Sequence, residues 1–89
     1  MSMPFQIGTT PNPNSIRVGL AESKFPKPVT YRSAQEAAAE PIAAALLEIK
    51  GVTQVFTLNN FITITKEPAA QWAVIEPKVA EILMANLNG

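Results

Sequence analysis

The residues on either side of Asn59-Asn60 constrain the fold of this chain more than any other segment. The segments 52–57 and 61–65 are rich in the β-branched and aromatic residues typical of strands, and Asn59-Asn60 lies between them. Asparagine tolerates the positive φ that a two-residue hairpin turn requires. The segment therefore predicts a β-hairpin with the asparagine pair as its turn.

This hairpin register assigns the large apolar side chains to two faces, because side chains alternate across a strand. One face receives an aliphatic, β-branched set that is expected to be core: Val55, Ile62 and Ile64. The opposite face receives Phe56, Leu58 and Phe61, on the side of the sheet that no helix is expected to cover. A bulge or a longer turn would shift the register and return this second set to the core.

The N-terminal part of the chain predicts a second pair of antiparallel strands. Alternation indicates strands over 5–7 and 16–20, and the two prolines and two asparagines over 8–14 indicate a stiff loop between them. Residues 22–28 contain two further prolines and are interpreted as a polar connection, which Val29 and Tyr31 extend briefly.

A helical segment is predicted between the two hairpins. Ser33 and Glu36 have the spacing of a capping box before a short helical turn over 34–39, and Pro41 suits the first position of the main helix. Gly51 is expected to end that helix. Its apolar stripe is predicted to contain Ile42, Ala45, Leu46 and Ile49.

A last helix is expected to begin near Pro68, and Pro77 should kink or divide it. Its buried face is predicted to contain Trp72, Ile75, Val79, Ile82, Leu83 and Leu87. The predicted order is therefore β-β-α-β-β-α. This order favours one α+β domain over residues 1–89, a two-layer sandwich in which a mainly antiparallel four-stranded sheet carries both helices on one face.

The side-chain inventory argues against an enzyme and against a metal or cofactor site. Among 89 residues there is no Cys, His or Asp, so the usual nucleophile, the usual base near neutral pH and the soft metal ligands other than Met are missing. Seven basic and seven acidic residues cancel, which favours neither nucleic acid nor a membrane surface as a partner. The first residues lack the pattern of a signal peptide, and the cytoplasm is the expected location.

Four motifs resemble, in order and spacing, the N-terminal domain of Nfu/NifU-type iron–sulfur scaffold proteins. They are the loop Thr10–Asn14, the Gly-Val and Val-Phe pairs over 51–56, the strand over 61–66 and the helix with Trp72 and Pro77. The resemblance implies the same α+β fold and a role in iron–sulfur cluster assembly. In multidomain members of the family, a second domain carries the Cys-x-x-Cys pair that holds the cluster. This chain resembles the part without that pair.

Two surfaces are candidates for binding. The first is the face with Phe56, Leu58 and Phe61, because exposed aromatic patches usually mark protein contacts. The second is the proline loop, where Asn12 and Asn14, with Arg17 behind them, could hold a peptide backbone or an anion. The alternative for this loop is structural, with prolines that stiffen it and asparagines that satisfy its own backbone.

Two classes of function follow from these surfaces. The first is a non-catalytic interaction domain for iron–sulfur assembly, whose partner is a cluster carrier or a client apoprotein. The second is a peptide- or anion-binding adaptor unrelated to clusters, which would use the asparagine loop with Arg17, Lys24, Lys27 or Arg32. In either class we expect a monomer or a weak homodimer.

The missing thiols and imidazoles generate a first prediction. After anaerobic reconstitution with iron and sulfide, the isolated chain should hold no iron–sulfur cluster, because it offers no Cys or His ligand. Visible absorbance after desalting measures this. A stoichiometric charge-transfer band that survives desalting would contradict the prediction.

Overall fold

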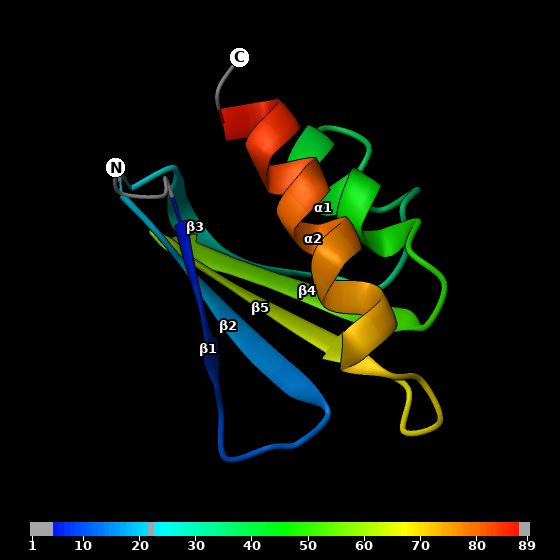
Figure 1. Ribbon diagram of the computed structural model, residues 1–89. Coiled ribbons are helices and arrows are strands. Elements are labelled where there is room, and N and C mark those ends of the chain that lie inside the picture. The colour runs from blue at the N-terminus through cyan, green and yellow to red at the C-terminus, as the bar shows by residue number, and fades with distance from the viewer. Residues whose placement is uncertain (1–4, 22, 88–89) are drawn as a thin grey trace.

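The computed structural model describes residues 5–21 and 23–87, of which Leu87 is described in its backbone only. Five strands form one antiparallel sheet in the order β1-β2-β5-β4-β3, and two helices lie together on one of its faces (Figure 1). The predicted two-layer α+β arrangement is confirmed. The elements are β1 Phe5–Thr9, β2 Ser15–Leu20, β3 Phe25–Tyr31, α1 Pro41–Leu47, β4 Val52–Asn59, β5 Phe61–Lys66 and α2 Trp72–Leu87.

The sheet has five strands, so the prediction of four was wrong. The missing strand, β3, was interpreted as a polar connection because Pro26 and Pro28 lie within it. Its C-terminal half pairs with β4 from Val29 to Tyr31, after a break in register. Proline is tolerated there because β3 lies at the edge of the sheet, where an absent N–H breaks no ladder on the outer side.

The segment before α1 forms the predicted capping box. The Glu36 amide donates to Ser33 Oγ at 3.1 Å, and the Arg32 amide donates to Glu36 Oε1 at 2.7 Å. Residues 34–39 form turns rather than a regular helix, and α1 then begins with Pro41 in the first turn, as predicted. Helix α1 ends at Leu47 with its cap at Glu48, so the prediction that Gly51 ends this helix was wrong; Gly51 lies three residues beyond the cap and has a φ of +101°.

The core lies between the helices and the inner face of the sheet. Of the predicted α1 stripe, Ala45 is only half-buried and Ala43 takes its place in the core, because this short helix turns positions 42, 43 and 46 toward the sheet. The three aliphatic side chains predicted as core in the second hairpin are fully buried. The fully buried or nearly fully buried aliphatic side chains of the hairpin and of both helices are Val55, Ile62, Ile64, Leu46, Ile75, Val79 and Leu83.

Helix α2 begins at Trp72, four residues later than predicted, and runs without interruption through Pro77. Pro77 therefore does not divide it. A residue at that position would normally donate to the carbonyl of Ala73, and Ala73 is an exposed residue, so the missing donor lies outside the core. On its buried face Trp72 and Ile82 are half-buried. Leu87 was predicted to lie on this buried face, but its side chain is not among those that the structure describes.

Gly51 generates a second prediction. A Cβ at this position would lie 2.8 Å from the Ala70 Cβ, and the φ of +101° is unfavourable for any L side chain. We expect Gly51→Ala to lower the free energy of unfolding by about 1–3 kcal/mol, as measured by urea denaturation.

Gly19→Ala is the matched control, because a Cβ there would meet nothing within 4 Å. This variant should be neutral or slightly stabilising, since alanine loses less backbone entropy than glycine in a strand. Equal losses of stability in both variants would show that the strain at Gly51 is not the cause.

Candidate interaction surface

The turn between β4 and β5 determines which side chains reach the open face of the sheet. Leu58 lies opposite Phe61 and Phe56 opposite Thr63, which is the predicted register. Asn59 has a φ of 54°, the only positive value among the described non-glycine residues, as a tight turn requires. The register therefore contains no slip at the turn.

The aromatic and aliphatic side chains of this face are half-buried. Phe56, Leu58 and Phe61 lie on the side of the sheet away from the helices, and each is partly covered by its neighbours in the sheet. We call these three residues together with Arg17 the open-face patch. Threonines surround it on the same face, because Thr30 pairs with Phe56 and Thr63 with Arg17.

Arg17 joins the patch through a cation–π contact. Its guanidinium carbon lies 4.4 Å from the centroid of the Phe61 ring, although the two residues are on different strands. Phe61 lies opposite Gly19, two positions from Arg17 on β2, so the Arg17 side chain reaches the ring diagonally across the two strands. This stacking holds an exposed guanidinium in a defined position with its N–H edges available to a partner.

The open-face patch has no acidic neighbour in the sheet. The five described strands contain no Asp or Glu, and their other cations are Lys27 on the edge strand and Lys66 on the helix side. The patch is therefore apolar with one fixed positive charge. Such a surface can bind an apolar partner segment that carries a carboxylate, and it offers no acid or base for catalysis.

The proline loop is satisfied by its own chain. Thr10 Oγ1 donates to the Asn12 carbonyl at 2.9 Å, and Asn12 Oδ1 accepts from the Asn14 amide at 2.9 Å. Lys66 Nζ donates to Asn14 Oδ1 at 3.2 Å. These contacts support the structural interpretation of Asn12 and Asn14.

Two further contacts anchor this loop to the helix layer. Trp72 Nε1 donates to the Pro13 carbonyl at 2.9 Å, and Lys66 Nζ lies 5.6 Å from the centroid of the Trp72 ring. Sequence reasoning assigned Trp72 to the core and missed its polar contact, because the two partners are 59 residues apart. The loop therefore connects β1 and β2 to the start of α2.

The other predicted cations are not brought together with Arg17. Lys24 and Lys27 border a hollow of about 200 Å³ beside Tyr31 and Glu40, at the β3 edge. Arg32 uses its backbone amide in the capping box. The described structure therefore contains no cluster of these cations with the asparagine loop, and an anion-binding adaptor is not favoured.

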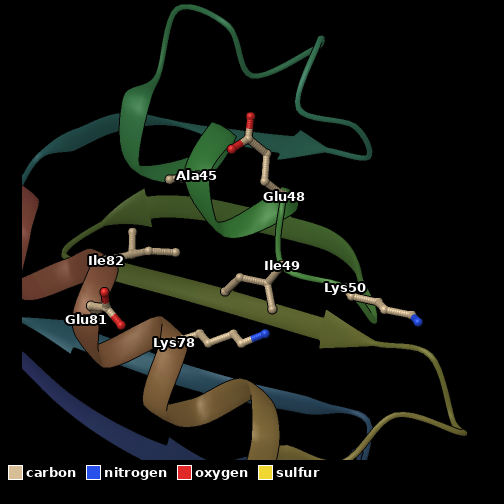
Figure 2. A pocket seen from close by; sticks show the side chains of 7 residues that line it. All are labelled: Ala45, Glu48, Ile49, Lys50, Lys78, Glu81 and Ile82. Carbon is tan, nitrogen blue, oxygen red and sulfur yellow. The ribbon is translucent and has the colours of Figure 1, made fainter.

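A groove of about 520 Å³ between the helices was not predicted. Figure 2 shows that Glu48 borders it from the cap of α1, Lys50 from the connection to β4, and Lys78 and Glu81 from α2. Its apolar lining consists of Ala45, Ile49 and Ile82. It exists only because α1 and α2 pack side by side, an arrangement that no local pattern specifies. Its charges of both signs select no particular ligand.

The described residues form neither a metal-ligand cluster nor a membrane-spanning helix. No group of three or more His, Cys, Asp or Glu side chains is placed to hold a metal ion in residues 5–21 and 23–87. None of the helices in the same part of the chain is long and apolar enough to cross a membrane.

The described residues thus form a domain of the two-layer α+β class, in which one face of a five-stranded antiparallel sheet is not covered by helices. The sequence match then gives the family: residues 5–89 match the family described as "Scaffold protein Nfu/NifU N terminal". The chain belongs to this family, which confirms the resemblance found in the sequence.

Curated relatives agree with this assignment. The chain is 39% identical over 85 residues to the mitochondrial NFU1 iron-sulfur cluster scaffold homolog of Drosophila willistoni, and 38% identical to that of Drosophila persimilis. Each match covers 93% of this chain and only 29% or 30% of the relative. The chain thus spans less than a third of the length of these relatives. Their names place them in mitochondria, and the cytoplasmic location of this chain stays a prediction.

Solved structures have the same fold. The crystal structure of protein SAV1430 from Staphylococcus aureus superposes with a TM-score of 0.80 at 30% identity, covering 91% of this chain and 99% of that one. The solution structure of a NifU-like protein from Saccharomyces cerevisiae gives 0.79 at 23% identity, covering 94% of this chain and 77% of that one. This second likeness supports the fold alone.

The Trp72 contact generates a third prediction. Trp72→Phe keeps an aromatic ring against the core but removes the N–H that holds the Pro13 carbonyl. We expect a loss of about 0.5–1.5 kcal/mol in the free energy of unfolding and faster amide exchange at Asn14 and Ser15.

Circular dichroism should follow the unfolding, because Trp72 is the only tryptophan. Gln71→Ala, at an exposed neighbouring position, serves as the control and should leave the exchange of the loop amides unchanged. Unaltered exchange in Trp72→Phe would mean that the indole contact does not hold the loop.

Proposed function

We propose that this chain is a non-catalytic protein-interaction domain that serves iron–sulfur cluster assembly or delivery, and that its partner carries the cluster. Family membership supports a role in iron–sulfur cluster assembly, and the relatives' names describe them as iron-sulfur cluster scaffold homologs. The sequence contains no Cys, His or Asp, which supports cluster ligands on another polypeptide or on another part of a longer one. The proposed partner is a cluster carrier or a client apoprotein.

The observation that carries the proposal is the open-face patch. Its three large apolar side chains lie on the uncovered face of the sheet, and the Arg17 guanidinium is fixed on Phe61 beside them. These side chains are already half-buried, so covering the rest of each in a partner contributes roughly half of the 1.5–3 kcal/mol that full burial gives, and three together are enough for a weak and specific complex. By binding a carboxylate of the partner, Arg17 would fix the orientation of the partner on the patch.

Binding to a separate Cys-x-x-Cys cluster domain, and to a cysteine-containing client apoprotein, tests the proposal. The chain is labelled with ¹⁵N and titrated with each purified protein, and backbone shifts report both the affinity and the surface involved. We expect shifts concentrated on β2, β4 and β5. The double variant Phe56→Thr, Phe61→Thr should bind at least about tenfold more weakly, because two apolar anchors are removed while strand propensity is kept.

Val74→Thr is the matched control, because Val74 is apolar and 57% exposed but lies on α2. It should bind like the parent. Arg17→Gln supplies a second test on an exposed side chain whose replacement leaves the core intact, and it should weaken binding with a reduced dependence on salt. Parent-like affinity in both patch variants, with native spectra, would contradict the proposal.

A further inference from the structure

The two edges of the sheet differ in their capacity to pair with another strand. At the β3 edge, Pro26 and Pro28 have no amide hydrogen, Lys27 adds a charge, and the register with β4 is broken. The β1 edge, Phe5–Thr9, contains no proline and no charged residue, and it pairs with β2 without a shift. Within the described part of the chain, β1 has a strand on one side only.

The direction of the free backbone groups on β1 follows from the pairing of β2. The Leu20 amide donates to the Asn60 carbonyl, and the Asn14 carbonyl accepts from the Lys66 amide, so even-numbered residues of this segment face β5. Backbone groups alternate in an antiparallel ladder, and the odd-numbered residues Arg17 and Gly19 therefore face β1.

Arg17 and Gly19 pair with Gly8 and Gln6, whose backbone groups point back toward β2. The N–H and C=O groups of the three remaining residues, Phe5, Ile7 and Thr9, consequently point outward. The outer edge of β1 thus offers three consecutive positions of a regular ladder, each with a donor and an acceptor.

We propose that this edge pairs with β1 of a second copy of the chain, antiparallel and about a twofold axis through Ile7. In this arrangement Ile7 lies opposite Ile7 of the second copy, Phe5 opposite Thr9, and Gln6 opposite Gly8. All outward groups of the three edge residues find partners in the other copy. The inference concerns a different part of the sheet from the open-face patch and stands independently of the proposed cluster role.

The residues of β1 favour a second copy as the occupant. Ile7 is half-buried and packs against the core, so two copies would extend their apolar edges into each other. Gln6 is exposed, and the absence of a side chain at Gly8 leaves room for it in the facing copy. The strand has no charge and the whole chain has a net charge of zero, so no like charges meet.

The small size of the contact makes this dimer weak. A pair of five-residue strands buries less than the roughly 1,200 Å² that stable specific interfaces bury. We therefore expect a monomer in dilute solution and a dimer whose fraction rises with concentration up to about 1 mM. Sedimentation equilibrium of the parent chain measures this. A parent that stays monomeric over the whole range overturns the proposal.

Charge variants at the centre of the proposed axis test the pairing itself. Ile7→Lys and Ile7→Glu each place like charges opposite each other in the dimer, so each variant alone should stay monomeric. An equimolar mixture should recover the dimer as a mixed pair. Val74→Lys, exposed on α2, is the control and should dimerise like the parent. Dimers of either variant alone, or a mixture of folded variants that stays monomeric, contradict the pairing.

Single cysteines provide a measurement that is independent of those variants, because the native chain has none. In the proposed pairing the two Ile7 Cα atoms are about 5.5 Å apart, within the range of a disulfide. The two Thr9 Cα atoms are separated by about four residues of strand, or roughly 13 Å. Mild oxidation should therefore cross-link Ile7→Cys and leave Thr9→Cys monomeric. Equal cross-linking of both variants, or cross-linking of Thr9→Cys alone, overturns the twofold register.

Discussion

The pairing of β4 with β5 about Asn59-Asn60 is the contact on which the remaining structure depends. These two strands occupy the middle of the sheet, with β2 added to β5 on one side and β3 added to β4 on the other. A slip of one residue would expose Ile62 and Ile64 and bury Thr63, which lies between them. The helices would then lose the apolar surface on which they pack. The positive φ of Asn59 is thus a local property with a consequence for the whole core.

Features that depend on residues close in sequence could be predicted. The hairpin register, the Ser33–Glu36 capping box and Pro41 in the first turn of α1 each involve positions within a few residues of one another. Strand β3 could not be recognised in this way, since its strand character comes from pairing with β4 about thirty residues later. Its prolines indicate a loop unless it is known that the strand lies at an edge.

The candidate surface also combines features that nearby residues predict with features that depend on distant residues. The alternation of side chains was enough to place Phe56, Leu58 and Phe61 on the open face. The stacking of Arg17 on Phe61 requires that β2 pairs with β5, and these strands are separated by about forty residues. The contact between Trp72 and the Pro13 carbonyl likewise joins residues that are far apart in the sequence. Turn chemistry did indicate that Asn12 bonds within its own loop, where it accepts from the Asn14 amide, whereas the contact of the Asn14 side chain with Lys66 again joins distant residues.

The two prolines of β3 have a consequence for how copies of this chain can assemble. A sheet with two competent edges can add molecules head to tail without limit, which leads to open fibres. Here the β3 edge lacks two amide donors, so strand addition is restricted to the β1 edge within the described residues. Any association of identical strands at β1 therefore has closed point-group symmetry and ends at two molecules. The prolines protect a small, open-faced sheet from polymerisation while leaving one edge able to pair.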